Sequence, residues 1–255
     1  MKKLVIIILS ILFSTVCIFA DEFEDKIIKA RDLLEEGYLS WNEAKMQESL
    51  AQFERLLFLE KEKYLVHYYL GLNSYRLAVF YNKDEDKSDK MTDMAINHLE
   101  ESQKLNNTFA ESYALLSSCY GLKIGMSPWK GMILGIKSGN LLDKAVSLEP
   151  DNPRVWLMKG ISTNYTPKIF GGSKEKALEE LKKAESCYEN EKRINPILPG
   201  WGYDETFAWM GIILKELGKL EQAKIILEKG LKINPENGWI KYQLLPQIEE
   251  ALEKQ

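Results

Sequence analysis

The segment from Asp204 to Asn237 contains two amphipathic helices that cannot form a stable structure alone. Apolar and small side chains recur at helical spacing along one face of each helix, and Pro235 ends the second helix. Gly211 and Ala223 allow the two helix backbones to approach closely. Because such a pair leaves one apolar face uncovered, we expect further copies of it to stack on that face.

The length and residue pattern of this segment resemble the tetratricopeptide repeat, a 34-residue helix pair. The resemblance implies an all-α fold, a right-handed superhelical α-solenoid of antiparallel helix pairs. Counting back 34 residues from Gly71 gives Gly37, which sets the register of the first two repeats. We expect one domain over 21–255, with repeats at about 30–63, 64–109, 110–152, 153–203 and 204–237 and a C-terminal capping helix over 238–254.

The repeats differ in the length of the segment between their two helices, so we expect lengthened loops in repeats 2, 3 and 4. Residues 81–90 of repeat 2 are polar and charged, as in a solvated loop. The insertions of repeats 3 and 4 are apolar, with a candidate loop cluster of Trp129, Ile169 and Phe170. We expect 122–137 to fold back on the turn at 166–173 and to bury Trp129 against Phe170.

The connection at 190–203 follows a second helix rather than a first helix. We therefore expect it at the edge of the array opposite the insertions.

Residues 1–20 have the features of a signal peptide. Lys2 and Lys3 precede an apolar run, and Ala20 provides a small residue at the cleavage point. We expect export to the periplasm or the medium, with no membrane span after cleavage. Two alternatives remain open, an uncleaved membrane anchor and a lipoprotein attached through Cys17. The bulky Val16 directly before Cys17 fits the lipidation motif poorly.

Composition argues against nucleic acid as a partner. Removing the two N-terminal lysines from the 34 basic residues leaves 32 against 38 acidic residues, a net charge of −6. No basic stripe remains that could neutralise a phosphate backbone. Cys119 and Cys187 lie among apolar residues at helical positions, which favours buried thiols, while a single disulfide between them remains open.

The sequence offers no set of catalytic residues, no metal-ligand spacing and no cofactor motif. His67 and His98 lie in repeat helices, where a structural role is the simpler interpretation. Residues 171–174, GGSK, lack the spacing and the preceding strand of a phosphate-binding loop. We therefore expect a protein that is not an enzyme.

The resemblance implies a concave groove lined by the first helix of each repeat. Carried onto this chain, the candidate groove residues are Tyr38, Trp41, Tyr68, Tyr75, Arg154 and Asn164. The leading hypothesis is an exported, non-enzymatic scaffold or adaptor that binds a protein segment or peptide in this groove.

The alternative hypothesis is a periplasmic carrier of a small, organic-acid-like ligand. Its basis is a looser similarity to the repeat component of tripartite transporters, which also has an FGG turn before a repeat helix. Neither hypothesis fixes the oligomeric state.

Overall fold

The computed structural model describes residues 22–254, and all regular structure in this range is helical. The expected signal peptide at 1–20 lies outside the described residues and stays a prediction. The chain is helical over 22–39, and the helices that follow are α2 (Glu43–Leu56), α3 (Lys63–Phe80), α4 (Glu85–Leu105), α5 (Ala110–Met126), α6 (Gly131–Leu148), α7 (Pro153–Tyr165), α8 (Lys174–Asn190), α9 (Tyr203–Glu216), α10 (Leu220–Ile233) and α11 (Leu245–Glu253). One turn of π-helix, Ile240–Leu244, leads into α11.

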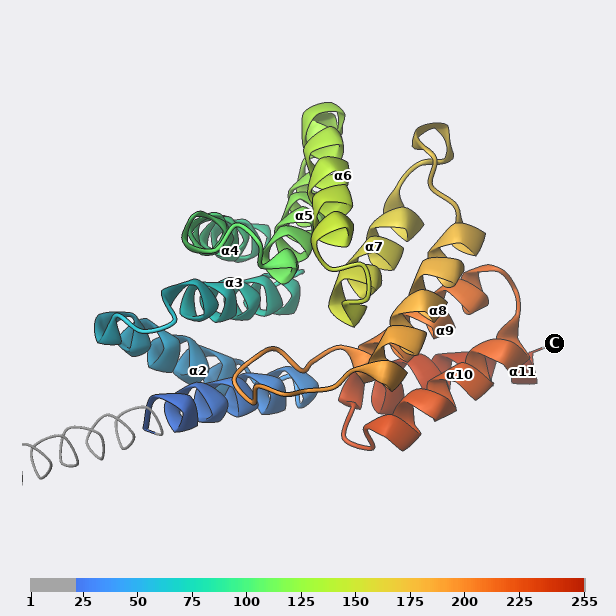
Figure 1. The fold of residues 1–255 in the computed structure, drawn as a ribbon. Helices are drawn as coiled ribbons and strands as arrows, with labels where there is room; N and C mark the ends of the chain where they lie inside the picture. The colour runs from blue at the N-terminus through green and yellow to red at the C-terminus, as the bar shows by residue number, and fades with distance from the viewer. Residues whose placement is uncertain (1–21, 255) are drawn as a thin grey trace, which may run out of the picture.

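Consecutive helices pack as antiparallel pairs, and the pairs stack in chain order (Figure 1). The helix at 22–39 with α2 forms repeat 1, and α3/α4, α5/α6, α7/α8 and α9/α10 form repeats 2 to 5. The segment from 238 to 253 covers the last pair. The fold is thus the predicted all-α superhelical solenoid.

The same glycine–leucine contact recurs inside three of the pairs. A Cβ added to Gly71, Gly160 or Gly211 would lie 2.6, 2.7 or 2.5 Å from a leucine side chain of the second helix. These distances are shorter than the non-bonded contacts of a Cβ atom, so a larger residue at any of these positions would force the leucine or the helices to shift. The leucines are Leu99, Leu181 and Leu227. Close packing of the glycine backbone against a leucine is therefore a contact that repeats 2, 4 and 5 share.

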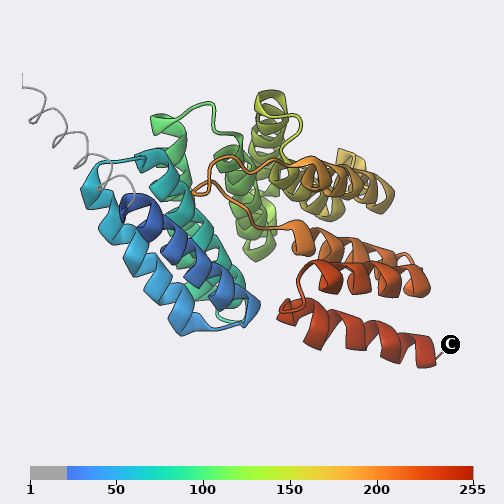
Figure 2. The same cartoon turned by 60° about the horizontal axis from the view of Figure 1, so that its bottom comes forward.

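The two ends of the array meet. Gly238, at the start of the last helical segment, lies so close to repeat 1 that an added Cβ would be 2.7 Å from the carbonyl oxygen of Leu39. Figure 2 shows the N-terminal helices and the C-terminal helices as the two arms of the array, with the connection between α8 and α9 passing between them. The solenoid is therefore curved far enough to bring its first and last helices into contact.

In repeats 2 and 3 the extra residues lengthen the helices rather than the loops. Asp84 caps α4 by accepting a hydrogen bond from the amide of Lys87, and Glu85 and Asp86 favour the N-terminal end of the helix dipole. In repeat 3, α5 continues to Met126, and a short 3₁₀ turn, Pro128–Lys130, leads directly into α6. A lengthened loop is present in repeat 4, where 166–173 separate α7 from α8.

No helix within 22–254 combines the length and the hydropathy that a membrane crossing requires.

Candidate functional site

The concave face of the solenoid is filled by the chain's own connection between α8 and α9, residues 191–202. Arg31 donates a hydrogen bond to the carbonyl oxygen of Pro196 (2.5 Å), and the Tyr69 hydroxyl donates to that of Ile197 (2.7 Å). The indole N–H of Trp201 donates to the Tyr68 hydroxyl oxygen (3.0 Å). We call 191–202 the groove segment. The sequence predicted this connection at the edge opposite the insertions, and the structure shows that it also extends across the concave face against repeats 1 and 2.

A buried polar network fixes the start of the groove segment. The Arg154 guanidinium donates through Nε to Glu111 (2.7 Å) and also pairs with Glu191, the first residue of the groove segment. The second oxygen of Glu111 accepts a hydrogen bond from the Tyr68 hydroxyl (2.9 Å). Arg154 and Glu111 are almost fully buried, so this network connects repeats 2, 3 and 4 beneath the groove segment.

A second buried network fixes the end of the groove segment. Arg76 is only 2% exposed, and its two terminal nitrogens donate to Glu35 (2.6 Å) and Glu205 (3.0 Å). The guanidinium carbon lies 4.2 Å from the ring centre of Tyr38 and 5.5 Å from that of Trp201. Burial raises the pKa of Glu205, and the positive charge of Arg76 opposes that rise. One arginine thereby joins repeats 1, 2 and 5.

Replacing Arg76 by methionine should destabilise the fold by about 3–5 kcal/mol, because the buried carboxylate of Glu205 and the half-buried carboxylate of Glu35 would lose their common cation. Denaturant unfolding followed by circular dichroism measures the change. The matched control is Arg55→Met on the exposed surface of α2, which should change stability by less than about 0.5 kcal/mol. Adding Glu35→Gln and Glu205→Gln to Arg76→Met should recover part of the loss. Equal stabilities of the Arg76 and Arg55 variants would contradict the role of the buried pair.

Three of the predicted groove residues, Tyr38, Tyr68 and Arg154, belong to the networks beside the groove segment. Tyr68 and Arg154 are buried in the two networks just described, and Tyr38 is half-buried against Arg76. Tyr75 and Asn164 are also half-buried. A partner peptide would need the volume that the groove segment already occupies.

Trp41 lies apart from this group, at the turn between the helix at 22–39 and α2. It is 43% exposed and has a φ of 53°, which is unfavourable for a bulky side chain. Its ring lies 5.1 Å from that of Phe80, which in turn lies 5.4 Å from Tyr81. These aromatic side chains line an open hollow of about 470 Å³ that also reaches Gln243.

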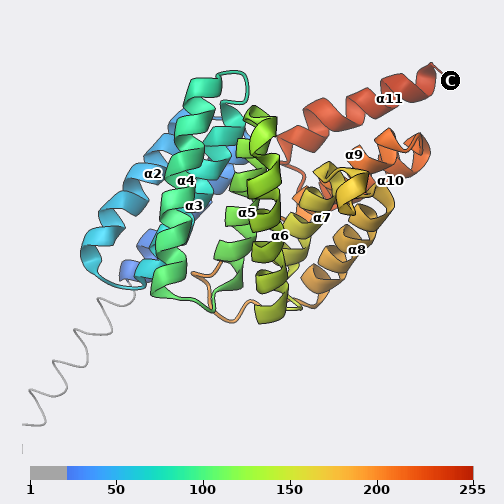
Figure 3. The same cartoon turned by 90° about the horizontal axis from the view of Figure 1, so that it is seen from above.

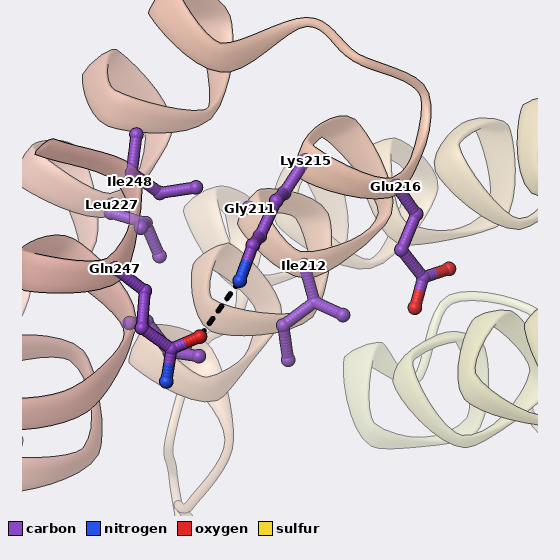
Figure 4. A pocket seen from close by; sticks show the side chains of 8 residues that line it. Gly211, Ile212, Lys215, Glu216, Leu227, Gln247 and Ile248 are labelled. Carbon is purple, nitrogen blue, oxygen red and sulfur yellow. Dashed lines mark hydrogen bonds between the residues drawn. The ribbon is translucent and has the colours of Figure 1, made fainter. Parts of the chain in front are cut away.

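A second hollow, of about 270 Å³, lies between α9, α10 and the C-terminal helix. Figure 4 shows Ile212, Leu227 and Ile248 around it, with Lys215 donating a hydrogen bond to Gln247 across its mouth (2.7 Å). Both hollows are open to solvent. Neither is the closed apolar cavity, walled by the insertions, that the carrier hypothesis requires.

The candidate loop cluster is exposed. Trp129 is 78% exposed, Ile169 85% and Phe170 71%, so the expected burial of Trp129 against Phe170 is wrong. The reason is that 122–137 continue the helices of repeat 3 straight outward instead of folding back. In Figure 1 the α5–α6 turn and the α7–α8 loop project from the same edge of the molecule as separate tips.

More apolar side chains accompany this cluster on the first turns of α6. Met132, Ile133 and Ile136 are each more than half exposed. We call the six residues together the turn edge: Trp129, Met132, Ile133, Ile136, Ile169 and Phe170.

The structure brings the two histidines together, a pairing that the sequence does not reveal because they lie 31 residues apart. The Nδ1 atoms of His67 on α3 and His98 on α4 are 3.0 Å apart. Burial, reinforced by His67, lowers the pKa of His98 to about 4, and burial also lowers the pKa of His67. Glu101 and Lys63 influence His67 in opposite directions. Within 22–254 no group of three or more side chains is arranged to hold a metal ion.

The histidine pair predicts a loss of stability in mild acid. His98 has a lower pKa in the folded protein than its ordinary value of 6.5, so the unfolded chain binds more protons between pH 6.5 and 4. The melting temperature should therefore fall by a few degrees from pH 7 to pH 5. The melting temperature of His98→Gln should fall less steeply over the same range. Asn97→Gln, on the exposed face of α4, is the control and should follow the wild type. Identical pH profiles for all three proteins would contradict the assignment.

Cys119 and Cys187 are buried free thiols, so the open alternative of a disulfide between them is not realised.

Comparison with solved structures shows a fold of the tetratricopeptide-repeat type. The HusA haemophore from Porphyromonas gingivalis superposes with a TM-score of 0.62 at 23% identity, covering 77% of this chain and 93% of HusA. TTC0263, a thermophilic TPR protein of Thermus thermophilus, superposes with a TM-score of 0.61 at 16% identity, covering 88% of this chain and 98% of TTC0263. No protein-family model and no curated protein matches the sequence. At these identities the likeness concerns the fold, which is a TPR-like solenoid.

Proposed function

We propose that this protein is an exported, non-enzymatic scaffold that docks onto another component of the cell envelope through its turn edge. The observation that carries the proposal is the contrast between two surfaces. The concave face is occupied by the groove segment, whereas six large apolar side chains remain exposed on the two projecting turns of repeats 3 and 4.

The size of the exposed side chains favours a docking surface. Burying one large apolar side chain contributes about 1.5–3 kcal/mol, so leaving several of them in water forgoes a substantial gain. Apolar patches of this kind on a folded domain mark surfaces that other molecules cover. The partner hypothesis from the sequence is therefore retained, but its contact surface moves from the groove to the turn edge.

Export is inferred from residues 1–20, whose charged start, apolar run and Ala20 fit a cleaved signal peptide. The non-enzymatic assignment rests on the chemistry of the described buried charges. Arg76 and Arg154 are engaged with carboxylates inside the fold, and the two histidines contact each other, so none of these groups faces a hollow where a substrate could react.

The double substitution Ile169→Ser and Phe170→Ser should separate docking from folding. Both side chains are exposed, so we expect a melting temperature within about 2 °C of the wild type. The fraction of protein that sediments with the cell envelope in the native host should fall severalfold. The matched control is Ile225→Ser on α10, an exposed apolar residue away from the turn edge. Undiminished envelope association of the double variant would refute the proposal.

A second candidate function is the transport of a planar apolar ligand. Two observations favour it, namely the fold shared with a haemophore and the hollow at Trp41, Phe80 and Tyr81, where aromatic rings lie in an open concave surface.

Titration with haemin tests this candidate. A carrier should bind one haemin per chain with saturable quenching of tryptophan fluorescence, and Trp41→Ala should weaken the binding at least about tenfold, corresponding to 1.4 kcal/mol. Trp129→Ala serves as a control for adsorption to the exposed turn edge. Binding that fails to saturate, or that is the same in both variants, would exclude a site in this hollow.

A further inference from the structure

We propose that the turn edge docks on the surface of a bilayer that contains anionic lipids. This inference rests on the proposed function, because it names the partner of the same surface. Repeats 3 and 4 combine a local excess of positive charge, lysines among exposed apolar side chains, and two projecting turns.

Acidic residues are missing from the segments that form the edge. The chain has 38 Asp and Glu residues and a net charge of −4, yet none of them occurs in 112–142 or in 152–174. These two segments contain the whole α5–α6 turn and the whole α7–α8 loop. The apolar side chains of the edge are thus exposed in a region that is locally positive, in a protein that is negative as a whole.

Three lysines lie among the apolar residues of the edge, Lys130, Lys137 and Lys168. None of the three forms an ion pair with another residue within 22–254, whereas Lys87 of the neighbouring repeat-2 turn pairs with Asp84. The ammonium group of Lys130 lies 5.7 Å from the ring centre of Trp129. Charged groups beside apolar ones therefore remain available to a ligand that combines negative charge with hydrocarbon.

The surroundings define where this surface ends. The repeat-2 turn next to it carries Asp84, Glu85 and Asp86. At the start of α8, the pKa of Glu175 is lowered by a backbone hydrogen bond and, to a smaller extent, by the positive charge of Lys168. The positive and apolar region is thus restricted to the tips of repeats 3 and 4. In Figure 3, which views the molecule from above, α6 and α7 lie at successive positions along the array.

An anionic bilayer surface matches each of these properties. Tryptophan rings are favoured at the boundary between headgroups and acyl chains, and isoleucine, methionine and phenylalanine gain by entering the acyl region. Lysines near the surface are attracted by anionic headgroups, and their flexible stems allow the ammonium groups to remain at that level. Two projecting tips can enter a fluid interface without the shape complementarity that a protein partner would require.

A second copy of the chain fits the surface less well. In a symmetric dimer the same patch faces itself, so lysines of one protomer would approach the lysines of the other. An acidic protein surface remains the competing partner, and the experiment below distinguishes it from lipid.

The test uses the full chain and vesicles of phosphatidylglycerol whose acyl chains carry bromine, a short-range quencher of tryptophan fluorescence. Residues 1–20 contain no tryptophan, so the signal reports on the folded body even if that segment enters the bilayer. We expect quenching of the wild type relative to unbrominated vesicles. Trp129→Phe should lose most of this quenching, and Trp41→Phe, which removes another exposed tryptophan, should keep it.

Charge is tested separately. Changing Lys130, Lys137 and Lys168 together to glutamate should weaken vesicle binding about tenfold or more, and vesicles of neutral phosphatidylcholine should give little quenching. Circular dichroism melting confirms that the triple variant is folded.

Two results would overturn the lipid assignment. One is the absence of quenching, or quenching that does not change in Trp129→Phe. The other is a wild-type dimer in sedimentation equilibrium that Trp129→Phe converts to a monomer, which would identify a second copy as the occupant.

If Ile169→Ser with Phe170→Ser lowers envelope association while brominated vesicles do not quench, the docking surface stands and its partner is a protein. If neither assay responds, the docking function itself fails.

Discussion

The buried guanidinium of Arg76 donates to Glu35 in repeat 1 and to Glu205 in repeat 5, and this bridge connects the two ends of the curved array. In a solenoid each repeat ordinarily contacts only the adjacent repeats, so the stability of the array is a sum of the stabilities of single repeats and of nearest-neighbour interfaces. Here a single cation links helices that are far apart in the chain. Because a buried charge without its partners is costly, the arrangement couples the first repeats to the last.

The groove segment explains why these charges are tolerated. Trp201 lies near Arg76 and donates to Tyr68, and the Tyr188 hydroxyl donates to the carbonyl oxygen of Trp201 (2.9 Å). The segment thereby excludes water from both arginine networks while it satisfies the tyrosines that line the groove. A surface that in an open solenoid would receive a peptide has here become the interior of the protein.

The fold could be predicted from the sequence because its determinants are local. Gly211, Ala223 and Pro235 specify one helix pair, and Gly71 and Gly160 repeat the same close contact with a leucine. The position of the groove segment could not be predicted in this way, since the hydrogen bond from Tyr69 to Ile197 joins residues 128 positions apart. Its apolar residues Ile197 and Trp201 were a sign that the connection is buried, but they do not indicate against which surface.

At the turn edge the sequence predicted burial where the structure shows exposure. Trp129 and Phe170 are apolar, and the general preference of such side chains for the interior led to the expectation that they pack on each other. Burial, however, requires a surface within reach, and the straight continuation of α5 and α6 carries Trp129 away from the rest of the chain. The helices of repeat 3 extend through most of 122–137 although this segment contains three glycines and Pro128. The groove segment meanwhile covers much of the concave face, and six of the large apolar side chains that stay exposed lie at the tips of repeats 3 and 4, the surface for which we propose a partner.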